Sequence, residues 1–225
     1  MLLNLIRSSC IALFVAAAPA QAVTLGASDF HAGDGSTSLT IGAATIQSNG
    51  GQLNVTMNSG LQSLGVSRGF EIDEIDDDES LLITFSGSGA VVSQIVLGRL
   101  FQAGTVGDLN HEAARLTTNA GTCAGGCLAS ASGSWNGSGS LAQLSSQLGT
   151  WSLTNPFGTG AITSLRLAAS LFANASGSAD SDFSLVSITF VPAQLPDIPE
   201  PGTASLLALG LAGLGLARRR RASAR

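Results

Sequence analysis

Short stretches in which apolar and polar residues alternate recur along most of the chain. Gly, Asn, Asp and Ser separate these stretches, and turns favour those residues. The clearest stretches lie at residues 36–42, 52–58, 80–87, 91–98, 149–155, 162–172 and 182–192. Because a period of two is typical of β-strands, seven or more such stretches predict an all-β fold. We expect an antiparallel β-sandwich or a jelly-roll-like body.

The stretch at 182–192 alternates most regularly. A uniform strand would place its side chains on two faces, with Phe183, Leu185, Ser187 and Thr189 on one and Ser184, Val186, Ile188 and Phe190 on the other. Since apolar residues occur on both, we expect both faces of this strand to be partly covered.

One segment has a different spacing. Leu141, Leu144 and Leu148 follow one another at intervals of three and four residues, after Ser140 and before Gly149. This pattern predicts either a short helix with one apolar stripe or a Ser-rich connector over the sandwich. The preceding residues 133–139 predict a loop, because Trp135 stands there among small residues.

The first 22 residues are typical of a secretory signal peptide. One positive residue, Arg7, precedes an apolar run at 10–18, and Ala20-Gln21-Ala22 provides the small-residue pattern of a cleavage site. Export through Sec-type machinery and cleavage by signal peptidase are therefore expected. The sequence then predicts one β-sandwich body at 23–192.

Beyond the body, the sequence predicts a Pro-rich linker at 193–202, a transmembrane helix at 203–217 and an Arg-rich cytoplasmic tail at 218–225. As a helix, 203–217 would be roughly 22 Å long, shorter than the roughly 30 Å hydrocarbon core of a membrane. A run of this length also suits a buried core helix. Four consecutive arginines directly after it favour the membrane alternative and predict that this end stays inside: Arg218, Arg219, Arg220 and Arg221.

The body is strongly acidic. Between residues 23 and 199, four arginines stand against fourteen Asp and Glu residues, which leaves a net charge of −10. Phosphate binding requires a basic surface, so nucleic acid is excluded as an expected partner.

Two cysteines lie in the body, Cys123 and Cys127, separated by three residues. In an exported protein this short loop predicts a disulfide, and two free thiols are the alternative. Cys10 lies in the leader, where its position does not fit lipid attachment. A structural zinc site is disfavoured because it needs about four ligands.

Acidic residues are concentrated just before the stretch at 80–87. Seven of nine consecutive positions are acidic: Glu71, Asp73, Glu74, Asp76, Asp77, Asp78 and Glu79. Calcium prefers such oxygen ligands, so a weak calcium site is possible. Its candidate ligands are Asp73, Asp76, Asp77, Asp78 and Glu79, although their spacing is not that of an EF-hand. The alternative is a solvated acidic turn that opposes edge-to-edge aggregation.

Catalytic motifs are scarce, and we expect no enzymatic activity and no catalytic residues. The chain has no Gly-x-Ser-x-Gly motif and no Lys, and its two histidines, His31 and His111, are expected at the surface. The segment beginning at His111 resembles the start of a zinc-protease helix but has Arg115 where the second histidine ligand belongs. A glycosidase with two carboxylates remains an alternative, although the few aromatic residues favour neither a glycosidase nor a lectin.

The end of the chain resembles the PEP-CTERM sorting signal, which consists of Pro-Glu-Pro, a short apolar helix and a basic cluster. The corresponding elements here are Pro199, Glu200 and Pro201, residues 203–217, and Arg218 to Arg221. The resemblance implies that exosortase, a membrane-embedded cysteine transpeptidase or protease, recognises the chain. Pro-Glu-Pro would be the recognition element, the helix a temporary inner-membrane anchor and the arginines a stop. Fixed proline φ angles would keep this segment extended for binding.

The body resembles, more loosely, a β domain common among PEP-CTERM proteins. The similarity lies at 64–87 and at 182–192. It implies an exported cell-surface or extracellular-matrix protein with a non-enzymatic cohesive or binding role, for which extracellular polysaccharide is a possible partner. The alternative function is a secreted carbohydrate-active enzyme or a calcium-dependent carbohydrate-binding protein.

Overall fold

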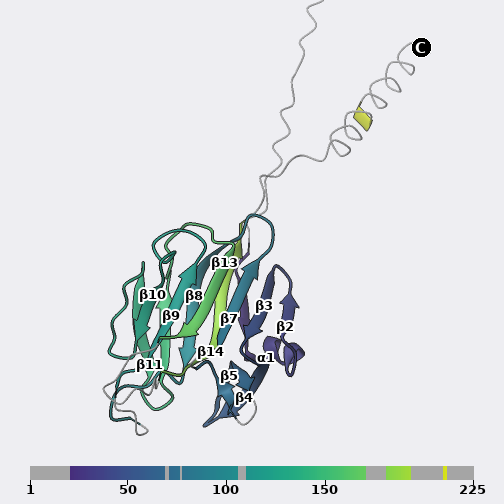
Figure 1. Ribbon diagram of the computed structural model, residues 1–225. Coiled ribbons are helices and arrows are strands. Elements are labelled where there is room, and N and C mark those ends of the chain that lie inside the picture. Colours follow the sequence, from purple (N-terminus) through teal and green to yellow (C-terminus); the bar gives the residue numbers. More distant parts are fainter. Residues whose placement is uncertain are drawn as a thin grey trace, which may run out of the picture. The chain divides into compact units, whose positions relative to one another are not determined.

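The computed structural model describes residues 21–68, 71–76, 78–105, 110–170, 181–193 and 210–211. The body lies within the compact unit Ala20–Leu195. Its strands form two antiparallel sheets, and Figure 1 shows how they are arranged.

The larger sheet has eight strands. Six follow one another in the order β11-β12-β8-β14-β5-β4, while β1 pairs with β14 and β6 pairs with β5. Their bounds are β1 Val23–Gly26, β4 Gln52–Asn58, β5 Leu61–Arg68, β6 Glu71–Glu74, β8 Ala90–Gly98, β11 Ser140–Ser145, β12 Thr150–Thr154 and β14 Ser184–Pro192. Strand β14 is central, because β8 pairs along one of its edges and β1 and β5 share the other.

The smaller sheet has six strands in the order β10-β9-β13-β7-β3-β2. Their bounds are β2 Ser38–Ile41, β3 Ala44–Asn49, β7 Ser80–Phe85, β9 Ala113–Thr118, β10 Cys127–Ser130 and β13 Ser164–Ala169. One helical turn, α1 (Ala27–Phe30), and the 3-10 turn His31–Gly33 follow β1.

The hydrophobic core lies between the two sheets. Side chains alternate along each strand, so that one face of each sheet is apolar and buried while the other carries mostly polar residues. The core includes Phe190 of β14 in the larger sheet and Phe85 of β7 in the smaller one, whose ring centroids are 4.9 Å apart. Full burial of such a side chain contributes about 1.5–3 kcal/mol relative to exposure, so contacts of this kind hold the sheets together.

The predicted antiparallel β body is confirmed, since each of the seven alternating stretches contains a strand. The face assignment of the last strand is wrong beyond Leu185. Val186 is an extra residue in the pairing of β14 with β8, so the alternation changes phase there. Consequently Leu185, Ile188 and Phe190 are all fully buried.

The segment at 141–148 forms neither the predicted helix nor an unpaired connector. Residues Ser140–Ser145 form strand β11 at the edge of the larger sheet, paired with β12. The pairing skips Leu144, whose side chain is 61% exposed. A bulge therefore explains the interval of three between Leu141 and Leu144 that resembled helical spacing.

Most of the two predicted targeting segments lies outside the described residues. Within 203–217 only Gly210 and Leu211 are described, and both are helical. In the part of the chain that the structure describes, no helix is both long enough and apolar enough to cross a membrane. The signal peptide, the membrane helix and the proposed domain boundaries therefore stay predictions.

Candidate functional site

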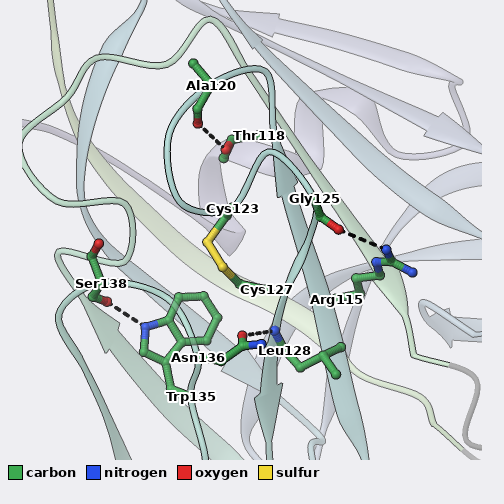
Figure 2. The surroundings of a disulfide bond; sticks show 10 residues. All are labelled: Arg115, Thr118, Ala120, Cys123, Gly125, Cys127, Leu128, Trp135, Asn136 and Ser138. Carbon is green, nitrogen blue, oxygen red and sulfur yellow. Dashed lines mark hydrogen bonds between the residues drawn. A yellow bond between two sulfur atoms is a disulfide. The ribbon is translucent and has the colours of Figure 1, made fainter.

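A disulfide closes the turn between β9 and β10. Cys123 and Cys127 are bonded as expected, their Cα atoms lie 5.0 Å apart, and both residues are buried. The Thr118 N–H at the end of β9 donates to Cys123 O at 3.1 Å, while Cys127 is the first residue of β10. The bond thus fixes the loop against the ends of two neighbouring strands (Figure 2).

This loop also holds an arginine side chain. Arg115 lies on β9, on the outer face of the smaller sheet, and its Nη2 donates to Gly125 O at 3.1 Å (Figure 2). Gly126 adopts a φ of 92°, a conformation that favours glycine. The guanidinium of Arg115 is therefore positioned by the backbone of the disulfide loop.

A second arginine, Arg166, projects from the neighbouring strand β13 on the same face. It pairs with Thr117 of β9, while Ala168, two residues further along β13, pairs with Arg115. Arg115 and Arg166 are therefore diagonal neighbours, and Cα atoms in this relation lie roughly 7–8 Å apart. Both side chains are exposed.

The two arginines line a shallow groove of about 540 Å³, which we call the Arg115–Arg166 groove. Its lining residues are Asp78, Glu79, Arg115, Thr117, Arg166, Ala168, Ala169 and Ser170. Alanines and hydroxyl residues accompany the charges. The groove thus combines two cationic groups with small neighbours that leave space above the sheet.

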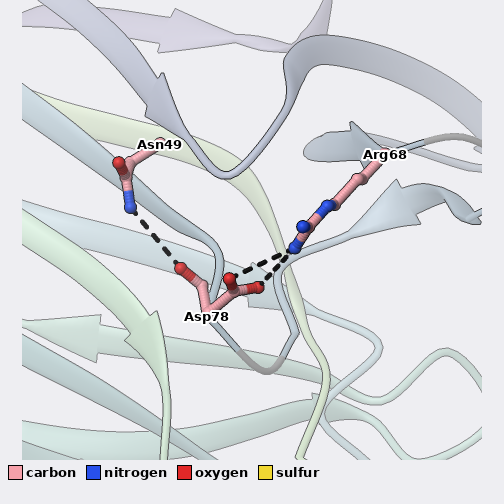
Figure 3. A network of polar contacts seen from close by, with 3 residues as sticks. All are labelled: Asn49, Arg68 and Asp78. Carbon is pink, nitrogen blue, oxygen red and sulfur yellow. Dashed lines mark hydrogen bonds and ion pairs between the residues drawn. The ribbon is translucent and has the colours of Figure 1, made fainter.

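Asp78, one of the two acidic residues that line the groove, already has hydrogen-bond partners in the protein. Nη1 of Arg68, on β5, donates to both carboxylate oxygens of Asp78, at 3.0 and 3.2 Å, and Asn49 Nδ2 donates to the Asp78 carbonyl at 3.5 Å (Figure 3). Glu79 is only 2% exposed. These contacts connect β5 of the larger sheet with β3 and the start of β7 in the smaller one.

The structure divides the acidic run among different surroundings. Glu74 ends strand β6 and forms a 2.7 Å ion pair with Arg99, whereas Asp78 is paired with Arg68. Within the described ranges, no group of three or more His, Cys, Asp or Glu residues could hold a metal ion. Of the candidate calcium ligands, Asp77 and the side chain of Asp73 lie outside the described residues, so the calcium prediction stays untested.

A smaller pocket of about 210 Å³ lies at the Arg99 ion pair. It is lined by Asn58, Ser59, Leu61, Arg99, Phe101, Gln147 and Leu148. Arg99 has a φ of 61°, and its guanidinium lies mostly buried beside Glu74. The ion pair with Glu74 therefore links the end of β6 to the residue that follows β8.

Both histidines are exposed, as expected. His31 Nε2 lies 2.5 Å from Gln62 Nε2, and His111 Nδ1 accepts a 3.2 Å hydrogen bond from the Ala103 N–H. Arg115, which replaces the second histidine of the zinc-protease pattern, lies in strand β9 and not in a helix. The geometry of that motif is therefore absent as well.

Sequence reasoning did not single out the Arg115–Arg166 groove. The only available signal was that the body has four arginines and that one of them, Arg166, occurs in an alternating stretch. Which strands are neighbours, and hence which arginines share a face, depends on the sheet order β10-β9-β13-β7. That order cannot be read from the alternation alone.

The predicted sorting residues Pro199, Glu200 and Pro201 and Arg218 to Arg221 lie outside the described residues, so their evidence comes from comparison. A family model described as the PEP-CTERM protein-sorting motif matches residues 197–221. The chain therefore carries a PEP-CTERM sorting motif. No curated protein and no solved structure matches the chain significantly.

Proposed function

We propose that the chain is an exported protein that exosortase recognises and processes at its PEP-CTERM motif, and whose β-sandwich then acts at the cell surface or in the extracellular matrix. The match at residues 197–221 carries this proposal. The motif indicates an exosortase-sorted protein of the cell envelope, and the processing step and the final location are our extension.

The body supports a location outside the cytoplasm. Its one disulfide among the described residues, Cys123–Cys127, suits an oxidising compartment. The described hydrophobic core of the two sheets consists of residues between 25 and 190. We expect the sandwich to stay folded after removal of the tail.

The intact mass of the protein recovered from cells with exosortase activity tests the processing step. The native chain should lack residues 218–225, and a variant in which Pro199, Glu200 and Pro201 are all changed to Ala should keep them. Pro196→Ala, which changes a proline of the same linker outside the motif, is the matched control and should be processed normally. Retention of the tail in the native protein would overturn the processing step.

We further propose that the body acts by binding or cohesion and not by catalysis. Exposed arginine and hydroxyl side chains along the groove on the outer face of the smaller sheet support a binding surface. Incubating the purified protein with polysaccharides should leave the number of reducing ends unchanged. A steady increase in reducing ends, lost on substituting one acidic residue, would instead establish the carbohydrate-active enzyme.

A further inference from the structure

Positive charge is scarce in the body and unevenly placed. Two of its four arginines form ion pairs, Arg68 with Asp78 and Arg99 with Glu74. Arg115 and Arg166 form no salt bridge within the described residues, and both lie in one groove. Half of the body's cationic side chains therefore face solvent together, on a body whose net charge is −10.

The spacing of the pair suits an anionic group. Two exposed guanidinium groups at diagonal positions repel each other only weakly in water, but an anion that lies between them is attracted to both. A guanidinium binds a carboxylate through two parallel hydrogen bonds, which makes arginine the residue best suited to planar anions. A carboxylate above Arg115 and Arg166 would relieve the repulsion.

One of the two groups is held in place before any ligand arrives. Arg115 uses one N–H on Gly125 O, and a guanidinium has five N–H donors, so several remain for a ligand. Ala168, on the same face of β13 as Arg166, adds only a methyl group beside the arginines and leaves space for a ligand. A positioned side chain loses less conformational entropy on binding, which raises affinity.

The rest of the face suits sugar hydroxyl groups. Thr117 and Ser170 line the groove, and Gln47 and Thr84 are exposed on the outer face of β3 and β7, in register with β13 through β7. These side chains donate and accept hydrogen bonds without carrying charge. An acidic polysaccharide presents hydroxyls together with well-separated carboxylates, whereas double-stranded DNA carries one charge per about 1.7 Å and would be repelled by the acidic body.

We propose that the Arg115–Arg166 groove binds the carboxylate groups of an acidic polysaccharide. The inference rests on the surface location proposed above and names the ligand class of the binding role. Asp78 and Glu79 also line the groove, so a second carboxylate of the ligand would have to lie away from these two carboxylates. The disulfide loop is a positioning element that acts through Arg115.

Affinity electrophoresis and calorimetry of the exported protein with alginate, and with neutral dextran for comparison, test the proposal. Alginate should bind, and dextran should not. The double variant Arg115→Gln/Arg166→Gln should bind alginate about tenfold or more weakly, because it loses two hydrogen-bonded charges. Binding should also weaken at high salt.

The matched control for Arg166→Gln is Asn58→Asp, which lowers the net charge by the same amount at the exposed last residue of β4. The carboxylate introduced there can still accept the hydrogen bond that Ser59 Oγ donates to Asn58 Oδ1. The control should keep wild-type affinity, while Arg166→Gln should not. Substitutions at exposed positions change stability little, so equal melting temperatures will show that all variants are folded.

Three results would overturn the proposal. They are absence of alginate binding, equal affinity of the double variant, and an equal loss in Asn58→Asp. Self-association that disappears in the double variant, without alginate binding, would assign the groove to the acidic surface of a second copy. In each case, a protein that still loses its tail and is still recovered from the cell surface would support the proposed sorting function. Failure of the binding proposal can therefore be distinguished from failure of the sorting proposal.

Discussion

Arg115 lies so close to Gly126 that a Cβ atom on Gly126 would be 2.5 Å from Arg115 Nε. The glycine therefore provides the space that the guanidinium occupies beside the disulfide loop. Because the guanidinium is the mobile end of a long side chain, a larger residue at 126 would displace it rather than break the fold. The position of Arg115 in the groove therefore depends on the absence of a side chain at residue 126 of the disulfide loop.

Gly126→Ala should weaken alginate binding, because it displaces Arg115 from Gly125 O. It should also cost about 1–2 kcal/mol of folding stability, since alanine tolerates a φ of 92° poorly. Gly121→Ala is the control that separates the loss of alginate affinity from the loss of folding stability. Gly121 lies in the same loop with a φ of 80°, but a Cβ there meets no atom within 4 Å.

Calorimetric titration and thermal unfolding of both variants check this prediction. Both should melt at lower temperature than the wild type, and only Gly126→Ala should lose affinity. Equal affinities in the two variants would show that the contact with Gly126 does not position Arg115.

Removal of the disulfide should destabilise the body moderately. A covalent loop of this length restricts the unfolded chain by about 2 kcal/mol in the chain-entropy model. For a domain of this size that corresponds to a decrease of roughly 4–8 °C in melting temperature. Cys123→Ala/Cys127→Ala should show this decrease and respond no further to reductant. A wild-type protein whose unfolding is unchanged by reductant would contradict the prediction.

Clear alternation predicted strands such as β4 and β12, because a period of two follows directly from the backbone. The predictions fail at bulges. One extra residue at Val186 reverses the faces of β14, and another at Leu144 makes an edge strand look helical. Bulges depend on the partner strand, which alternation within a single stretch does not reveal.

The candidate site was predictable only in part. The Cys123–Cys127 bond follows from two nearby cysteines in an exported chain, and it is local in sequence. The neighbouring positions of Arg115 and Arg166 depend instead on β13 pairing with β9, about fifty residues earlier in the chain. The acidic run was visible, but its division between the partners Arg68 and Arg99 was not.

Asp78 should behave as the partner of Arg68 and not as a calcium ligand, because a guanidinium 3.0 Å away repels a second cation. Both side chains are largely exposed, at 62% and 71%, so Asp78→Asn should change folding stability by no more than about 1 kcal/mol. Thermal unfolding in calcium, with magnesium as the control, checks this. A rise specific to calcium that disappears in Asp78→Asn would establish the calcium site instead.

The indole ring of Trp135 lies against the backbone of Gly137, in the space that a side chain at residue 137 would occupy. A Cβ on Gly137 would overlap the indole ring at Trp135 Cζ2, and the indole N–H donates to Ser138 O at 2.6 Å. The ring packs against the core, and Ala129 of β10 forms an isolated bridge with Trp135. The loop at 133–139 thus covers the end of β10 through one aromatic side chain.

Gly137→Ala should push the indole outward, with loss of the Ser138 hydrogen bond and of ring packing. The expected cost is about 1–3 kcal/mol, typical of forcing an extra carbon into a packed site. Trp135 fluorescence should shift to longer wavelength while buried Trp151, which donates to Leu100 O at 2.9 Å, keeps its emission. Gly160→Ala is the control, because a Cβ there meets no atom within 4 Å. If Gly137→Ala melts and fluoresces like Gly160→Ala, the loop adapts without moving the ring, and Gly137 is not what holds Trp135.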